Sequence, residues 1–238
     1  MKKIFIILLI LISFIYGLLV GYKRIFPFEY LKIIKIELLG NYDNLQQYGS
    51  HYRHKKSQFD MVDNLNKNSN RIAMFGDSLI EYGSWNELIQ TKSIILNRGI
   101  GGDTTVGLLN RIDSLGENVK KTFLMIGVND LFLGRCVEDI FFNYKEIIKI
   151  LIEKNIEPIV MSTLYTGGDY AQYYNDDIKK LNELLVIYAK DEKIIFIDIN
   201  SELAKGTVLE DIYSQDGVHL NGDGYLKWSN AISKYFEK

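Results

Sequence analysis

RIAMFGDSL, residues 71–79, is the stretch that decides the fold, because an apolar run ends in glycine and a serine follows two residues later. A short apolar run bounded by glycine is typical of a buried strand. In open α/β sheets, ligands bind at the carboxyl ends of the strands, and this order places the Ser78 hydroxyl at that edge. Serine is a weak nucleophile without a neighbouring base, so the remaining sequence must supply one.

Histidine occurs three times, as His51, His54 and His219. The first two lie in the charged stretch HYRHKK with no strand near them, whereas His219 ends the loop sequence DGVH just before a helical pattern. A carboxylate three residues before an imidazole suits a tight loop in which Asp216 orients His219. Because imidazole titrates near neutrality, we predict that His219 takes the proton of Ser78 and returns it to the leaving group.

After residue 70 the sequence alternates between short apolar runs and longer helical patterns. The runs are apolar on both faces, which is typical of parallel strands covered by helices on both sides. The helical patterns repeat apolar residues every three or four positions. We therefore predict a doubly wound α/β domain. The predicted strands are Ile72–Phe75, Ile94–Leu96, Thr122–Ile126, Pro158–Met161 and Ile194–Ile197, and the helical stripes run over 137–151, 178–188 and 225–235.

The composition limits the class of protein. At 238 residues and 47% hydrophobic content, the chain has enough apolar sequence for one substantial core and an accessory segment. A net charge of −2 argues against a nucleic-acid partner. The single cysteine, Cys136, excludes an internal disulfide and a cysteine-based metal cluster, and we expect it to pack. We predict no metal and no cofactor, and the oligomeric state stays open.

The N-terminus has the pattern of a membrane anchor. Ile4–Tyr22 is a run of 19 uncharged, mostly apolar residues, which as a helix would span roughly 28 Å. We predict a single-pass transmembrane signal anchor over 1–23, a partly helical connector over 24–69 and a catalytic domain over 70–238. The second half of the connector is polar, and its Asn-rich end is typical of a loop. Lysines flank the run on both sides, so the positive-inside rule does not decide its orientation. We expect the large domain to be extracytoplasmic. Secretion after signal cleavage is the alternative.

Two further loops follow predicted strands and carry hydrogen-bond donors. They are NRGIGGDT, residues 97–104, and GVND, residues 127–130. Attack of serine on a carbonyl creates an oxyanion, which backbone N–H groups and asparagine amides stabilise. We predict that the backbone N–H groups of Gly102 and Ser78 and the side-chain amide of Asn129 form this oxyanion hole.

The polar and aromatic neighbours of these loops have simpler roles. We expect Asp77 and Asp130 to hold loop geometry by accepting backbone hydrogen bonds. Asp103 and Thr104 have the position of a helix N-cap for residues 105–115. Tyr82 and Trp85 follow Ser78 closely, and each either lines the substrate pocket or packs in the core.

Taken together, the four sequence blocks resemble the SGNH, or GDSL, hydrolase family, over residues 71–236. NRGIGGDTT, residues 97–105, is most similar to the branch of platelet-activating-factor acetylhydrolase-type enzymes. The resemblance implies a flavodoxin-like three-layer α/β/α sandwich with strand order 2-1-3-4-5. It also implies a Ser78, His219 and Asp216 triad, with Gly102 and Asn129 in the oxyanion hole of a serine esterase or lipase.

Other classes of protein fit the sequence less well. A two-metal phosphoesterase needs several histidines, and residues 70–238 hold one. A nucleotide-binding fingerprint is incomplete at residues 99–102. Three alternatives stay open: a catalytically silent binding protein on the same fold, an acyltransferase such as an O-acetyltransferase of cell-envelope glycan, and a lipase-like enzyme. The substrate is expected to be a small-molecule, lipid or glycan ester, with a small acyl group favoured.

Overall fold

The computed structural model describes residues 11–17, 49–65, 70–116 and 118–236. The chain divides into two units, Met1–Asn44 and Leu45–Lys238. In the first unit, residues 11–17 are helical. The anchor predicted over residues 1–23 lies mostly outside the described residues, and within the described ranges no helix combines the length and hydrophobicity that crossing a membrane requires. The anchor therefore stays a prediction.

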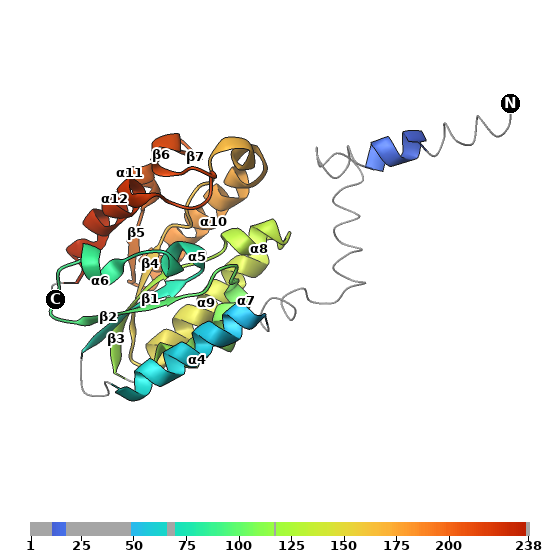
Figure 1. Ribbon diagram of the computed structural model, residues 1–238. Coiled ribbons are helices and arrows are strands. Elements are labelled where there is room, and N and C mark those ends of the chain that lie inside the picture. Colours follow the sequence, from blue (N-terminus) through green and yellow to red (C-terminus); the bar gives the residue numbers. More distant parts are fainter. Residues whose placement is uncertain (1–10, 18–48, 66–69, 117, 237–238) are drawn as a thin grey trace, which may run out of the picture. The chain divides into compact units, whose positions relative to one another are not determined.

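A five-stranded parallel sheet in the order β2-β1-β3-β4-β5 lies at the centre of the second unit (Figure 1), which confirms the predicted topology. Gly76 pairs with Gly99 on one side and with Met125 on the other, so three neighbouring strands end level with one another. The loops that follow these strands therefore start at the same edge of the sheet. The strands are β1 (Arg71–Gly76), β2 (Ile94–Gly99), β3 (Val119–Met125), β4 (Glu157–Met161) and β5 (Ile195–Ile197).

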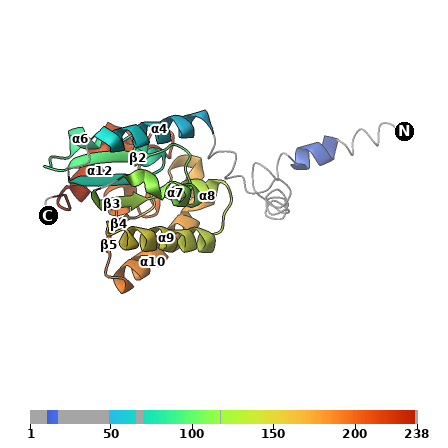
Figure 2. The ribbon, with the colours of Figure 1, turned by 90° about the horizontal axis from the view of Figure 1, so that it is seen from below.

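Helices cover both faces of this sheet (Figures 1 and 2). One face packs against α7 (Thr105–Asn110), α9 (Val137–Glu153) and α10 (Ala171–Asp191). The other packs against α5 (Ser78–Glu81), α6 (Trp85–Leu88), α11 (Asn200–Leu203) and α12 (Gly222–Ser233). The three predicted helical stripes are confirmed as α9, α10 and α12. The remaining elements are α4 (Ser50–Leu65), α8 (Val128–Phe132), the 3-10 turns η1 (Ile112–Leu115), η2 (Gly168–Tyr170) and η3 (Asp211–Tyr213), and a hairpin of β6 (Ala204–Lys205) and β7 (Val208–Leu209).

Successive residues of β1 belong to two separate cores. Ala73 and Phe75 are fully buried in the core on the α9 and α10 face, whereas Ile72 and Met74 are buried in the core on the α12 face. Side chains of a strand alternate between faces, so burial on both sides requires an apolar residue at every position. This explains why β1 is an uninterrupted apolar run from Ile72 to Phe75.

The helix predicted over residues 105–115 is shorter than expected. α7 ends at Asn110, and at Arg111 the backbone leaves the helical conformation before η1 begins. The Arg111 side chain is fully buried and binds Asp103. Thr104 is the N-cap of α7 and accepts a hydrogen bond from the Gly107 N–H at 3.2 Å. Asp103 does not cap the helix, because its Oδ2 binds Arg111 and its Oδ1 accepts the Thr104 N–H at 2.9 Å.

The connector, predicted to be partly helical, contains the helix α4, whose Phe59 is 4% exposed. Tyr52, Phe59 and Val62 recur at helical spacing on the inner face of α4, a pattern that the surrounding charged residues obscure. Cys136, expected to pack, is exposed at the N-cap of α9.

Candidate active site

The hydroxyl of Ser78, the imidazole of His219 and the carboxylate of Asp216 form a continuous chain of hydrogen bonds. Ser78 Oγ lies 3.0 Å from His219 Nε2, and His219 Nδ1 lies 2.7 Å from Asp216 Oδ2. With Asp216 ionised, Nδ1 donates to the carboxylate, and Nε2 is left to accept the serine proton. The geometry is that of a nucleophile, a base and a group that orients the base.

The loop before α12 holds Asp216 in place. Its Oδ1 accepts the backbone N–H groups of Val218 at 2.9 Å and His219 at 2.7 Å, so the carboxylate closes its own turn. Partial burial raises the pKa of Asp216, but these bonds and the bond from the imidazole outweigh it and lower the pKa to about 2. Asp216 is therefore ionised at neutral pH.

The strand-to-helix turn fixes Ser78. Asp77 is the N-cap of α5, and its Oδ1 accepts the Leu79 N–H at 3.0 Å. Ser78 is the first residue of α5 and is 7% exposed, and its N–H belongs to the turn whose donors have no partner within the helix. The Tyr225 hydroxyl of α12 donates to the Leu79 carbonyl at 2.8 Å, which ties α5 to the helix that follows His219.

The loop after β2 makes a tight turn beside Ser78. The Asp103 N–H donates to the Ile100 carbonyl at 3.1 Å, and Gly102 has a φ of +76°, a conformation that favours glycine. The hydrogen bond of the turn uses the N–H of Asp103 and not that of Gly102. A Cβ on Gly99 would lie 2.2 Å from the backbone nitrogen of Glu81, so glycine is also needed where β2 approaches α5.

Asn129 lies on α8, in the loop after β3. Its Nδ2 donates to the Asp103 carbonyl at 2.9 Å, which links this loop to the turn that contains Gly102. An amide nitrogen carries two protons, so Asn129 keeps a second donor. The structure thus places Ser78 against His219, and Asn129 against the turn that contains Gly102. The oxyanion roles of Gly102 and Asn129 stay predictions.

Three buried carboxylates support these loops. Burial raises the pKa of Asp77 to about 7, although the bond from Leu79 opposes this, and Asp103 and Asp130 raise it further. Burial likewise raises the pKa of Asp130 to about 7, while bonds from Thr105 lower it. As predicted, Asp130 accepts a backbone N–H, that of Thr105, at 2.9 Å. Within the described ranges, no group of three or more His, Cys, Asp or Glu side chains is arranged to hold a metal ion.

Arg111 connects the loop that follows β1 with the loop that follows β2. This residue was not identified from the sequence. Its Nε donates to Asp103 Oδ2 at 2.6 Å, its Nη1 to the Arg98 carbonyl at 2.9 Å and its Nη2 to the Gly76 carbonyl at 2.8 Å. Two of these bonds end on the last residue of β1 and the residue before the last of β2, and the third ends on Asp103 in the loop after β2. The arginine therefore holds the nucleophile loop and the glycine loop in one arrangement.

The two aromatic candidates have different surroundings. The Tyr82 ring is 59% exposed and its centroid lies 5.3 Å from that of His219, so it lines the site. Trp85 is 1% exposed, donates its indole N–H to the Ile80 carbonyl at 2.8 Å and packs edge-on against Trp228. Trp85 has no surface for a substrate, so the packing interpretation holds for this residue.

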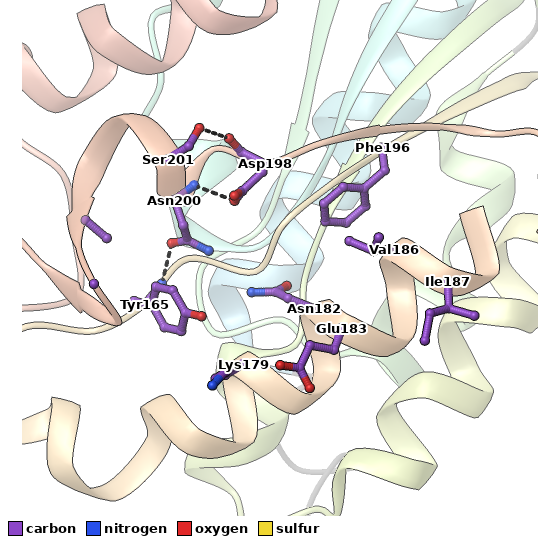
Figure 3. Close-up of a pocket in the computed structure, with 12 residues that line it drawn as sticks. Tyr165, Lys179, Asn182, Glu183, Val186, Ile187, Phe196, Asp198, Asn200 and Ser201 are labelled. Carbon is purple, nitrogen blue, oxygen red and sulfur yellow. Dashed lines mark hydrogen bonds between the residues drawn. The ribbon is translucent and has the colours of Figure 1, made fainter. Parts of the chain in front are cut away.

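A separate cavity of about 740 Å³ opens beyond the carboxyl end of β5 (Figure 3). Tyr165 and Phe196 form part of its wall. The amides of Asn182 and Asn200 are bound to the backbone of residues 163 and 165, so they serve the fold. Its lining residues include none of Ser78, His219 and Asp216, so this cavity is not the site described above.

A hydroxyl, imidazole and carboxylate in series at the carboxyl edge of a doubly wound sheet define the class of serine hydrolases. Comparison with known proteins identifies the family within that class. Residues 74–227 match the model of the GDSL-like Lipase/Acylhydrolase family, and the chain belongs to that family. The matched residues include Ser78, Asp216 and His219.

Solved structures and curated relatives are similar to this chain to different extents. A Streptococcus pneumonia structure assigned as a platelet activating factor is 27% identical, with a TM-score of 0.71 over 86% of this chain and 99% of that one. The carbohydrate acetylesterase Est24 from Sinorhizobium meliloti shares the fold, with 13% identity and a TM-score of 0.58 over 70% of this chain and 97% of that one. The N-acylneuraminate cytidylyltransferase of Streptococcus agalactiae serotype V is 34% identical over 126 residues, which is 52% of this chain. The match spans only 30% of that relative's length.

Proposed function

We propose that the protein hydrolyses esters of small acyl groups through an acyl-enzyme on Ser78. The observation that carries the proposal is the hydrogen-bonded series from Ser78 Oγ through His219 to Asp216, at 3.0 and 2.7 Å. The series supplies a nucleophile, a proton acceptor and a fixed negative charge that stabilises the imidazolium.

In the proposed reaction, Ser78 Oγ attacks the ester carbonyl while its proton passes to His219 Nε2. The carbonyl electrons move onto the oxygen, which the N–H groups of Ser78 and Gly102 and the amide of Asn129 stabilise. The intermediate then expels the alcohol, which takes the proton from His219, and an acyl-serine remains. Water then attacks the acyl-serine carbonyl while His219 takes its proton. The second intermediate expels Ser78 Oγ, which takes the proton back from His219, and the carboxylic acid is released.

Two neighbours support a carbohydrate ester as the substrate. The solved neighbour Est24 is a carbohydrate acetylesterase, and the curated relatives that share 126 residues with this chain act, by name, on N-acylneuraminate. Both names concern acylated sugars, so we propose an O-acetylated sugar as the substrate class. A lipid ester and transfer of the acyl group to a sugar hydroxyl are the competing outcomes.

A fluorophosphonate probe and an ester panel test the proposal on the full chain. Wild type is expected to label, and Ser78→Ala is expected not to. Ser84→Ala is a matched control, because Ser84 is exposed and its side chain does not cap α6. Activity is expected to fall from acetate to long-chain p-nitrophenyl esters, and O-acetylated sugars are expected to be cleaved. Absence of labelling in folded wild type would exclude a serine nucleophile, and a long-chain preference would exclude the small-acyl assignment.

We also propose that residues 4–22 anchor the protein in a membrane with the catalytic domain outside the cytoplasm. The proposal rests on the 19 uncharged residues of that run. Full-length protein is expected to stay in the membrane fraction after an alkaline carbonate wash, and a variant lacking residues 4–22 is expected to be released. Release of both would contradict an anchor.

A further inference from the structure

The carboxylate of Glu81 binds the glycine loop, residues 100–102, which follows β2. It is the last residue of α5, three positions after Ser78, and its side chain is 7% exposed. Its Oε2 accepts the backbone N–H of Gly101 at 2.6 Å. The bonded N–H belongs to the Ile100–Gly101 peptide, which directly precedes the peptide that carries the Gly102 N–H, so the carboxylate fixes the backbone just before that donor.

Two side chains of α4 bind the same carboxylate. His51 Nε2 lies 3.0 Å from Glu81 Oε2, and Lys55 Nζ lies 2.9 Å from Oε1. Burial raises the pKa of Glu81, but the bonds from His51, Lys55 and Gly101 outweigh it and lower the pKa below its ordinary value. Glu81 is therefore ionised, and α4 supplies the charge that balances it.

This cluster lies next to the nucleophile. A Cβ on Gly101 would lie 3.8 Å from Ser78 Cβ and 3.8 Å from His51 Nε2, so these two residues flank Gly101. A negative carboxylate this close would oppose the negative charge that forms on the substrate oxygen. Neutralisation by Lys55 allows Glu81 to orient the glycine loop without that repulsion.

The attachment of α4 does not depend on these contacts. Phe59 is buried, and the guanidinium of Arg98 lies 4.7 Å from the centre of its ring. Asp63 forms ion pairs with Arg98 and Arg71 at the far end of the helix. Substitutions at residues 51 and 55 therefore leave the other anchors of α4 in place.

We propose that Glu81 is a positioning residue for ester hydrolysis. It fixes the Ile100–Gly101 peptide, and through it the next peptide, which carries the Gly102 N–H used for oxyanion binding, while α4 holds Glu81 through His51 and Lys55 and neutralises it through Lys55. The inference rests on the proposed roles of Ser78 and Gly102. α4 lies before the family-matched residues 74–227, so it extends the active site beyond that region. A glycine pair has wide conformational freedom, which explains why a charged clamp is needed here.

Steady-state kinetics of full-length variants test the proposal. Glu81→Ala is expected to lower kcat by up to ~10²-fold, the effect of a small misplacement of catalytic groups, with KM within about three-fold of wild type. Glu81→Gln keeps an oxygen that accepts the Gly101 N–H, and it is expected to restore most of kcat. Lys55→Ala is expected to lower kcat several-fold. Lys56→Ala is the matched control, because Lys56 pairs with Asp60 on an exposed part of the same helix.

A second arm separates positioning from general structural damage. Glu81→Ala combined with Asn129→Ala is expected to lose less than the product of the two single effects, because both act on the same oxyanion. If Glu81→Ala does not fold, Glu81→Gln and Lys55→Ala carry the test, read as kcat at unchanged thermal midpoint.

The proposal is overturned by a kcat within two-fold of wild type in folded Glu81→Ala, by a change confined to KM, or by equal effects of Lys55→Ala and Lys56→Ala. In each of these cases the proposed function would still hold if wild type hydrolyses esters and Ser78→Ala does not. Wild type without esterase activity would instead refute the proposed function itself.

Discussion

Arg111→Met is expected to be one of the most destabilising single changes in the domain. The side chain is fully buried, forms an ion pair with Asp103 and donates to the carbonyls of Gly76 and Arg98. Removing one partner of a buried ion pair costs about 3–5 kcal/mol, and each buried acceptor left without a donor costs about 1–3 kcal/mol. The lower limits together give a loss of about 5 kcal/mol, which is comparable to the whole stability of many domains.

Urea unfolding of the full chain, followed by circular dichroism, measures this loss. For a domain of this size, about 5 kcal/mol corresponds to a fall of roughly 10–20 °C in the thermal midpoint. Arg111→Lys keeps the charge but cannot reach all three acceptors, so it is expected to lose about 2–4 kcal/mol. If Arg111→Met does not fold, Arg111→Lys is the variant that tests the prediction.

The double variant Arg111→Met with Asp103→Asn measures how much of the lost stability comes from leaving the Asp103 carboxylate buried without its partner. Removing both charges no longer leaves a buried carboxylate alone, so the double variant is expected to regain about 2–3 kcal/mol relative to Arg111→Met. A loss below about 2 kcal/mol for Arg111→Met, or strictly additive effects in the double variant, would refute the reasoning.

The remaining predictions concern the site and its pH dependence. Asn129→Ala is expected to lower kcat by about 10²–10³ through loss of an oxyanion donor, and a two-fold change in ester hydrolysis would contradict that role. Asp216→Asn keeps the turn but not the charge, and kcat is expected to fall by about 10³–10⁴ at an unchanged thermal midpoint; since the pKa of Asp216 is about 2, wild-type activity is expected not to report its titration above pH 4. The folded-state pKa of Asp77 is raised from 3.8 to about 7, so its contribution to stability is fully present below pH 3.8 and is lost as the pH rises through 7. Asp77→Asn is therefore expected to gain up to about 4 kcal/mol relative to wild type between pH 4 and pH 8 in urea unfolding, and parallel pH curves would contradict this. Tyr82→Ala is expected to raise KM several-fold with kcat within about three-fold, because the exposed ring lies beside His219 and takes no proton in the reaction.

The pattern of short apolar runs along the sequence was sufficient to predict the positions of the five strands. β1 to β5 lie where short apolar runs end in glycine or polar residues, because a strand buried on both faces needs apolar side chains at every position. Ser78, Asn129 and His219 were found for a related reason, since each follows or precedes a regular element at a sequence position that the fold brings to one edge.

The residues that the sequence did not reveal depend on tertiary contacts. His51 was set aside because no strand lies near it, yet α4 places it against Glu81. Arg111 lies within an ordinary helical pattern, and only the packed structure shows that its guanidinium binds the ends of two strands. The partner of a long polar side chain is chosen by packing between distant segments, and a single sequence carries little signal for that choice.

The hydrogen bond between Ser78 and His219 joins residues 141 positions apart. A ribosome makes the chain from its N-terminus, so the nucleophile, the glycine loop and Asn129 all emerge well before the base. Until α12 has docked and the Tyr225 hydroxyl has reached the Leu79 carbonyl, the serine has no proton acceptor. On the proposed mechanism, a nascent chain, or a chain cleaved before His219, is therefore expected to be inactive.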